Sequence, residues 1–383
     1  MPTLPSASFA DGAVEVTLLQ QIGEPSAPDA AREAQIAAVA DYVASFVKGA
    51  HTSLDLAIYD FRLDGPVGEK VAAALEAAAA AGVTIRVAHD PTTAEGAPVP
   101  GGDATVATHG GVGKPADADG FLDRLSGFVS VKPIKGFEAL MHNKYVIRDG
   151  LAADVAVLMG STNFTNDAWG LQENNLVVLR SQELASFYAT DFMQLWSRGK
   201  ITESTGYHDT GTVHVAGIPV TVAFTPGESA TIVHAVVNAV EIAKSRLSVA
   251  AMVMSSGPIA AAVSESIDRG VEIKGLYDGP QMDTVLHQWA AAGIGADKAA
   301  TWKKVAAHLA RKDSIPYAPG SPHNFMHDKL IVADNVVVTG SFNFSNHARG
   351  NAENTLLIKD KAVADTYDAY IRGLAARYSR GDS

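Results

Sequence analysis

Hydrophobic and polar positions follow two different periods along this chain, and segments of the two kinds alternate. Short apolar or alternating runs, typical of strands, occur at 14–20, 53–61 and 83–89. Apolar residues three or four apart, typical of amphipathic helices, occur at 30–50, 66–81 and 181–197. Strands that alternate with helices predict an α/β fold.

The same order of elements recurs in the second half of the chain. The strand-like runs there are 213–224, 247–254 and 271–278, and the helix-like runs are 229–245 and 258–269. Asp90, at the end of one strand-like run, recurs 188 positions later as Asp278. Similar offsets through both halves indicate an internal duplication with a period of about 185 residues. We therefore predict two α/β halves, residues 1–205 and 206–383.

Residues 90–127 interrupt this pattern. They are rich in Gly, Pro, Ala and Thr and show little periodicity. A loop of this length is either a lid or binding loop or a tolerated surface insertion, and the sequence leaves both open. Gly110, Gly111 and Gly113 within it follow no predicted strand, so we do not expect a nucleotide-binding glycine motif.

Composition narrows the classes of function. The 383 residues carry a net charge of −12, which disfavours a protein that wraps long stretches of nucleic acid. The chain has no Cys, which excludes disulfides, thiolate metal sites and thiol catalysis. No apolar run is long enough to predict a membrane span. No signal peptide is visible, which leaves a cytoplasmic protein or a secreted one whose signal was removed.

Two stretches repeat the same polar and glycine residues in the same order. Each holds His-x-Lys, an Asp five residues after the Lys, then Gly-Ser-x-Asn-Phe and Glu-Asn. The first set is His142, Lys144, Asp149, Gly160, Ser161, Asn163 and Glu173. The second set is His327, Lys329, Asp334, Gly340, Ser341, Asn343 and Glu353. A set of this size, found twice in one order, is a far stronger signal than a single His-x-Lys.

Strand parity predicts how these side chains point. In a strand, His142 and Lys144 share one face, and Asp149 falls on the other. The second copy has the same parity. We therefore interpret Asp149 and Asp334 as residues that order the turn after each strand. If each Gly-Ser-x-Asn strand pairs with its His-x-Lys strand in a hairpin, the His, Lys, Ser and Asn side chains converge.

The convergent side chains suit a phosphate diester. The lysines supply compact positive charge, and the Ser and Asn side chains supply neutral hydrogen bonds to a pentavalent phosphoryl centre. The predicted phosphate-binding residues besides the lysines are Ser161, Asn163, Ser341 and Asn343.

Two histidines, one from each half, allow a two-step reaction. One attacks phosphorus, and the other protonates the leaving alcohol and then deprotonates the incoming water or alcohol. Glu173 and Glu353 are candidates to accept the Nδ1 proton of a histidine, which would fix its tautomer and raise its basicity. This mechanism requires no metal and no cofactor.

The pattern His-x-Lys-x4-Asp followed by Gly-Ser-x-Asn resembles the signature of the phospholipase D superfamily, and both copies fit it. The resemblance implies two α/β/α sandwich halves related by a pseudo-two-fold axis, with the active site at their junction. It also implies a phosphohistidine mechanism in which His142 is the nucleophile and His327 the general acid. One departure is the ten-residue segment between Asp149 and Gly160, against five residues in the second copy, which predicts a longer hairpin turn.

Three functions are open at this stage. The leading hypothesis is a phosphodiesterase that cleaves or exchanges the headgroup of a glycerophospholipid, with transient contact to a membrane surface. The second is an endonuclease or phosphodiesterase acting on DNA or RNA, which the charge disfavours. The third is a non-catalytic binding protein, which the two intact motifs argue against.

Weaker features surround the second motif. Lys304, His308, Arg311 and Lys312 recur at helical spacing, which favours a solvated helix face over an anion site. His89 ends a predicted strand and is a candidate to line the cleft, although a lone His is more often a satisfied surface or core residue. His323 and Tyr317, in the Pro-rich loop 315–325, are candidates to rim the active-site pocket.

Overall fold

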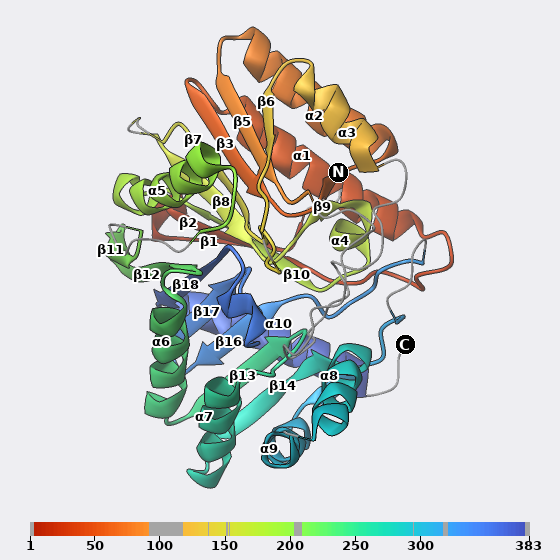
Figure 1. Cartoon of the computed structure of the whole chain (residues 1–383), viewed down its shortest axis with the longest axis vertical. Helices are drawn as coiled ribbons and strands as arrows, with labels where there is room; N and C mark the ends of the chain where they lie inside the picture. The colour runs from red at the N-terminus through yellow and green to blue at the C-terminus, as the bar shows by residue number, and fades with distance from the viewer. Residues whose placement is uncertain are drawn as a thin grey trace.

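Two eight-stranded sheets with the same strand plan form the frame of the protein (Figure 1). The computed structural model describes residues 4–379 apart from 92–117, 137, 151, 153, 203–208, 294 and 317–320. The first sheet runs β1-β2-β10-β8-β7-β3-β5-β6, and the second runs β11-β12-β18-β17-β16-β13-β14-β15. In each, one central strand pairs antiparallel with one neighbour and parallel with the other. This confirms the α/β class and the duplicated plan.

The strands of each sheet come from one half of the chain. In sheet order, the first holds Ser6–Phe9, Val14–Leu19, Asn174–Leu179, Ala156–Gly160, Lys144–Arg148, Ser53–Ile58, Thr84–His89 and Ser130–Pro133. The second holds Gly211–Val215, Ile218–Thr225, Glu353–Lys359, Val336–Gly340, Lys329–Ala333, Arg246–Ala251, Glu272–Asp278 and Ala310–Lys312. Two further short strands, β4 (Phe61–Arg62) and β9 (Phe164–Thr165), pair with each other. The predicted boundary at 205/206 lies outside the described residues and stays a prediction.

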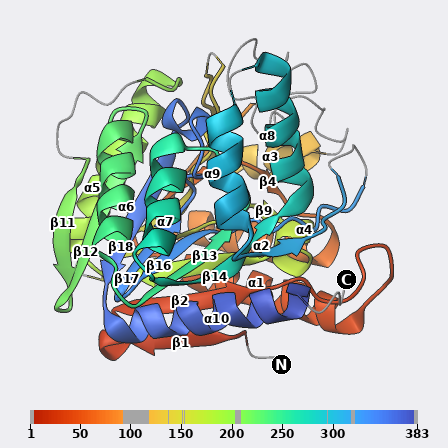
Figure 2. The same cartoon turned by 90° about the horizontal axis from the view of Figure 1, so that it is seen from below.

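Helices cover both faces of each sheet (Figures 1 and 2). The outer face of the first sheet carries α1 (Ala30–Lys48), α2 (Gly65–Ala80) and α3 (Ala118–Ser126). The outer face of the second carries α6 (Ser229–Ile242), α7 (Gly257–Asp268), α8 (Gly279–Ala292) and α9 (Ala296–Ala306). The inner faces carry α5 (Gln182–Arg198) and α10 (Lys361–Ser379), and α4 (Asn166–Gly170) is a single short turn. No described helix is both long and apolar enough to cross a bilayer.

Local sequence explains where the principal helices begin and end. The Asp29 carboxylate caps α1 by accepting the N–H groups of Ala31 and Arg32 at 2.8 and 3.0 Å. The Ser181 hydroxyl caps α5 in the same way. At its other end α5 stops at Gly199, whose φ of 65° is the left-handed conformation that glycine adopts without a Cβ penalty.

A shared core joins the two halves. It contains apolar residues of the inner sheet faces together with buried residues of α5 and α10. Tyr188 of α5 lies edge-on to Tyr145 of the first sheet and to Phe224 of the second, with ring centroids 5.0 and 5.1 Å apart. Because such packing excludes water from both sheets at once, the halves form one body.

The halves also exchange backbone pairs along a line that we call the seam. It consists of two isolated parallel bridges, Met141 with Ala352 and Glu173 with Met326. Helix α10 lies alongside β1 and β2 of the first half (Figure 2). There the Tyr370 hydroxyl donates to the Leu19 carbonyl at 2.5 Å.

Residues 90–127 are only partly described. The expectation of an irregular loop is wrong for residues 118–126, which form α3 and pack on the first sheet through Phe121, Leu122 and Leu125. Weak apolar periodicity hid this helix, because its three anchors are surrounded by polar and small residues. Residues 92–117, including Gly110, Gly111 and Gly113, lie outside the described residues.

Asp149 and Asp334 order turns on the side of the sheets away from the histidines. Asp149 adopts a φ of 54°, and its carboxylate accepts the backbone N–H groups of His51, Thr52 and Ser53. Asp334 has a φ of 50° and accepts the N–H groups of residues 244, 245 and 246. These are the contacts expected of residues that order a turn.

We expect Asp149→Ala to lower the free energy of unfolding by about 1–3 kcal/mol, because three partly buried backbone donors lose a charged acceptor. Asp149→Asn keeps one acceptor and tolerates the positive φ, so it should cost less. Urea unfolding followed by circular dichroism measures both. Equal midpoints for the wild type and Asp149→Ala would show that the turn does not depend on this carboxylate.

Candidate active site

The two motifs form matching hairpins whose first residues meet at the seam. β7 pairs antiparallel with β8, and β16 pairs antiparallel with β17, as the sequence predicts. The strands begin at Lys144 and Lys329, so His142 and His327 lie two residues before them. Both histidines are buried, with 2% and 1% of their surface exposed.

The backbone of each histidine is fixed by the opposite half. The N–H of His142 donates to the carbonyl of Ala352 at 2.9 Å, and that of His327 donates to the carbonyl of Glu173 at 3.2 Å. Because partners on another strand define both positions, neither histidine belongs to a mobile loop.

Two buried aspartates hold the residues just before the histidines. Asp90 accepts the N–H of Met141 at 2.7 Å, and Asp278 accepts that of Met326 at 2.9 Å. Burial raises the pKa of Asp278 to about 6, although the hydrogen bonds from Met326 and Ser314 oppose this. In the sequence, Asp90 and Asp278 serve only as markers of the repeat offset. Their recurrence at the ends of equivalent strands is the feature from which a role at the site could have been predicted.

His142 has a carboxylate partner from the other half. Its Nδ1 lies 2.7 Å from Oε2 of Glu353, which is fully buried. Burial lowers the pKa of His142 to about 4, although Glu353 acts to raise it, so the imidazole is neutral at pH 7. Burial would raise the pKa of Glu353, but His142 and Lys144 hold it below its ordinary value. The pair therefore supplies a neutral ring beside a permanent negative charge.

His327 has an amide partner instead. Its Nδ1 lies 2.9 Å from Oδ1 of Asn174. The expectation that Glu173 and Glu353 are equivalent is wrong by one residue. Gly160 pairs with Leu176, whereas Gly340 pairs with Thr355, so the offset falls from 180 to 179 within the hairpin.

The hydrogen bonds of the motif serines support the same alignment. The Ser161 hydroxyl accepts the N–H of Asn175, and the Ser341 hydroxyl accepts that of Asn354, each at 3.0 Å. Glu353 therefore corresponds to Asn174. The first half has two consecutive Asn residues after its Glu, which made two alignments available from the sequence.

Glu173 serves a different purpose from the one predicted. Its carboxylate accepts from Lys312 Nζ at 2.5 Å and from the Tyr378 hydroxyl at 2.6 Å, and no described contact joins it to a histidine Nδ1. Both members of the Lys312–Glu173 pair are buried. The prediction of a helix face that includes Lys312 is also wrong, because α9 ends at Ala306 and Lys312 lies on β15. Lys304, by contrast, makes an exposed ion pair with Asp268.

The two motif lysines point back toward their own histidines. Lys144 Nζ donates to the carbonyl of His142 at 2.6 Å, and Lys329 Nζ makes the same bond with His327. Burial lowers the pKa of Lys144, and it lowers that of Lys329 to about 7 although Glu353 and Asp328 oppose it. An arriving phosphate would restore full charge to both ammonium groups.

The motif serines are engaged with protein partners. The Ser161 hydroxyl lies 2.8 Å from Asn174 Oδ1 and 3.0 Å from Asp328 Oδ1, and it can donate to either. The glycines that precede both serines are required sterically. A Cβ on Gly160 or Gly340 would lie 2.0 or 2.2 Å from a carbonyl oxygen of the neighbouring strand. In this structure the serines position neighbouring residues, and the expected phosphate contact stays a prediction.

Asn163 and Asn343 differ from the motif serines in their hydrogen bonding, and their predicted role as phosphate ligands stays a prediction. Both are largely buried, with 7% and 9% of their surface exposed. Among the described residues, neither Oδ1 atom has a hydrogen-bond partner. Amide orientations follow from hydrogen bonding, so each side chain can present its NH2 group to a phosphate oxygen.

Residues that sequence reasoning missed tie the halves together symmetrically. Asn175 accepts from the Tyr367 hydroxyl at 3.2 Å, and Asn354 donates to the Tyr188 hydroxyl at 3.1 Å. The residue between each motif His and Lys also faces the shared core. Asp328 accepts from the Tyr370 hydroxyl at 2.9 Å.

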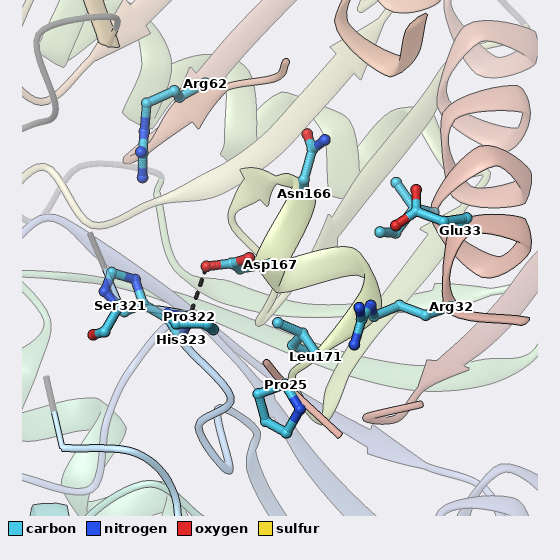
Figure 3. Close-up of a pocket in the computed structure, with 11 residues that line it drawn as sticks. Pro25, Arg32, Glu33, Arg62, Asn166, Asp167, Leu171, Ser321, Pro322 and His323 are labelled. Atoms are coloured by element: carbon cyan, nitrogen blue, oxygen red, sulfur yellow. Dashed lines mark hydrogen bonds between the residues drawn. The ribbon is translucent and has the colours of Figure 1, made fainter. Parts of the chain in front are cut away.

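A polar pocket of about 390 Å³ lies between residues of both halves (Figure 3). Arg62 and Asp167 line it from the first half, and His323 lines it from the second. The N–H of His323 donates to Asp167 at 3.0 Å, so this bond joins the two halves at the wall of the pocket. His323 lines this pocket, but none of the residues of the two motifs does, so its place at the rim of the active-site pocket stays a prediction. Tyr317 lies outside the described residues. His89 is not among the residues that line this pocket, and its Nδ1 lies 3.1 Å from the Asp90 carbonyl.

Known proteins resemble this chain in both sequence and fold. A family model described as "Cardiolipin synthase, PLD-like domain" matches residues 43–196 and 236–375, one segment in each half. A phospholipase D of Rickettsia bellii (strain RML369-C) is 32% identical over 155 residues, which are 39% of this chain and 65% of that protein. The matched region therefore spans less than two thirds of that relative.

Two solved structures share the fold over most of the chain. Phosphatidylserine synthase of Haemophilus influenzae Rd KW20 matches with a TM-score of 0.59 over 98% of this chain and 88% of its own, at 11% identity. Polyphosphate kinase of Porphyromonas gingivalis matches with a TM-score of 0.53 over 85% of this chain and 47% of its own, at 10% identity. With the family match covering both halves, this chain belongs to the phospholipase D superfamily of phosphodiesterases.

Proposed function

We propose that this protein is a metal-independent phosphodiesterase that cleaves or exchanges the headgroup ester of a phospholipid through a phosphohistidine on His142. The observation that carries the proposal is the His142–Glu353 contact of 2.7 Å at a site where a second histidine arrives from the other half. A neutral, oriented imidazole with its Nδ1 proton held by a carboxylate presents its Nε2 lone pair to an electrophile.

The first step transfers the phosphatidyl group to the enzyme. Nε2 of His142 attacks phosphorus, and the bond from phosphorus to the headgroup oxygen breaks. Protonated His327 gives its Nε2 proton to that oxygen, so the headgroup leaves as a neutral alcohol. Glu353 balances the positive charge that the phosphorylated imidazole carries.

The second step returns both histidines to their starting state. Water or another alcohol gives a proton to His327 as its oxygen attacks phosphorus. The phosphorus–nitrogen bond breaks, and its electron pair returns to His142. Lys144, Lys329 and the Asn163 and Asn343 amides stabilise the charge on the phosphoryl oxygens in both steps.

The choice of a lipid substrate rests on several observations. The family model is described as cardiolipin synthase, and the Rickettsia relative is named a phospholipase D. The net charge of −12 disfavours a long nucleic acid as the principal partner. A nucleic-acid diester is the second candidate because the same two-histidine chemistry cleaves any accessible diester. A non-catalytic binding role would leave the buried His142–Glu353 pair without a purpose.

The acceptor experiment tests the reaction and its substrate together. With phosphatidylcholine vesicles, EDTA and a few per cent of ethanol, we expect phosphatidylethanol, detected by mass spectrometry, because ethanol can replace water in the second step. His142→Ala is the control and should give none. If the wild type forms neither phosphatidylethanol nor phosphatidic acid, the lipid assignment is wrong, and single-stranded DNA becomes the substrate to test. Loss of activity only in EDTA would contradict metal independence.

Replacing either histidine should abolish turnover. We expect His142→Ala and His327→Ala to lower kcat by at least about 10⁴-fold, because each removes a group that forms a bond or moves a proton in every cycle. Circular dichroism and thermal unfolding establish that the variants are folded. A folded variant of either kind with the wild-type rate would contradict the two-histidine mechanism.

Glu353→Gln separates charge from geometry. The amide oxygen can still accept the Nδ1 proton, but the negative charge is lost, so we expect kcat to fall on the order of 10²–10³-fold. Because burial holds the pKa of His142 near 4, protonation of His142 should lower the activity of the wild type only on the acidic limb of the pH profile, as the pH falls toward about 4. In Glu353→Gln the same limb should move to lower pH, since the group that raised the pKa is gone. Steady-state rates between pH 3.5 and 9 measure both effects.

A further inference from the structure

The two histidines occupy equivalent places but contact chemically different partners. His142 Nδ1 faces the Glu353 carboxylate at 2.7 Å, and His327 Nδ1 faces the Asn174 amide at 2.9 Å. Glu353 and Asn174 are equivalent by strand pairing, because each lies one residue before the Asn whose N–H donates to the motif serine. The two halves therefore differ by one negative charge at the residue that contacts the histidine Nδ1, and this contact governs the basicity of the ring.

The Asn174 amide is fixed from several sides. Its Oδ1 also lies 2.8 Å from the Ser161 hydroxyl, and its Nδ2 donates to the Ala168 carbonyl at 3.0 Å and to Gln172 Oε1 at 3.2 Å. Donors on the Oδ1 side and acceptors on the Nδ2 side fix the orientation of the amide, so its oxygen faces His327. His327 is therefore held with a proton on Nδ1 and a reactive Nε2.

The remaining charges near His327 are already engaged. Glu173, the residue before Asn174, accepts from Lys312 and from Tyr378. Asp328 accepts from Tyr370 and Asn175. Among the described residues, the charged or titratable groups that interact with one another in this region include Glu173 on the seam, Lys312 on β15, Asp278 at the end of β14, Tyr370, Arg377 and Tyr378 on α10, Asp328 and Lys329 in the second motif, and Glu353.

We propose that Asn174 is the positioning residue that separates the roles of the two histidines, by giving His327 a neutral partner where His142 has a carboxylate. The inference rests on the proposed function. A ring whose Nδ1 faces an amide oxygen releases its Nε2 proton to the leaving oxygen more readily than one whose Nδ1 faces a carboxylate. A ring with a carboxylate partner carries positive charge more easily, as His142 must when it holds the phosphoryl group. The amide thus makes His327 the proton donor and leaves covalent chemistry to His142.

Asn174→Asp tests this assignment because it adds a charge without changing size. With ¹⁵N-labelled histidine, NMR titration should show the His327 pKa raised by about 1 or more. The kcat limb that requires protonated His327 should move to higher pH by the same amount. Asn174→Ala is the matched control, because it removes the amide without adding charge, and it should not raise this pKa. An unchanged His327 titration in folded Asn174→Asp would overturn the proposal.

The exchange variant Asn174→Asp/Glu353→Gln moves the carboxylate from one histidine to the other at constant net charge. Quenching during turnover in base, followed by peptide mass spectrometry, locates the phosphohistidine. We expect it on His142 in the wild type and on His327 in the exchange variant. An adduct that stays on His142 would contradict the proposal. If the variants with Asp at position 174 do not fold, Glu353→Gln alone decides, because it should distribute the adduct over both histidines.

The two readouts distinguish failure of this inference from failure of the proposed function. If the wild type forms no adduct and turns over no diester, the proposed function is wrong, and the NMR titration still decides whether Asn174 controls His327. If the wild type is active and the pKa of His327 is the same in the wild type and in Asn174→Asp, only the inference is wrong.

Discussion

Backbone hydrogen bonds across the seam are the constraint on which the site depends. Each histidine N–H donates to a carbonyl of the other half, and the residue before it is held by a buried aspartate of its own half. These bonds fix the main chain of both histidines before any side chain is considered. Side-chain contacts at Nδ1 then orient the rings. Because the core between the sheets is shared, a shift of one half against the other would break the histidine N–H bonds and the Nδ1 contacts together, since both run between the halves.

The two sheets have equivalent strand orders, but the residues at equivalent positions around the two histidines differ in charge. Glu353 in one half corresponds to Asn174 in the other. At the seam the apolar Ala352 corresponds to Glu173, which is part of a buried ion pair with Lys312. A buried ion pair seldom adds net stability over an apolar pair of similar size, so its presence in one half only is better explained by specificity than by stability. The two halves share a scaffold and differ in electrostatics.

The sequence predicted the fold class, the duplication and most element positions, because long amphipathic helices and apolar strands carry strong periodic signals. It failed for α3, whose few apolar anchors are diluted by polar residues, and for Lys312, whose helical spacing continued past the real end of α9. In the site, strand parity predicted which side chains of each hairpin share a face. The sequence named Glu353 as a candidate partner of a histidine, but it could not assign that partner to His142 and it missed Asn174, because each partner comes from the opposite half.

The one-residue error in aligning the two halves shows most clearly what the sequence alone does not predict. Aligning Glu173 with Glu353 matched identical letters, yet strand pairing aligns Asn174 with Glu353. The spatial role follows the hydrogen-bond register, which identical residues at neighbouring positions cannot reveal.

The crossed anchoring of the histidines also bears on why both halves lie in one polypeptide. If two identical copies of a single half built the same site, every substitution would appear twice, and both rings would always have the same partner. Joining the copies removes that restriction. A change at one position then alters the neighbourhood of one histidine and leaves the other as it was, so a site built by duplication can divide its labour without giving up the frame that made it symmetric.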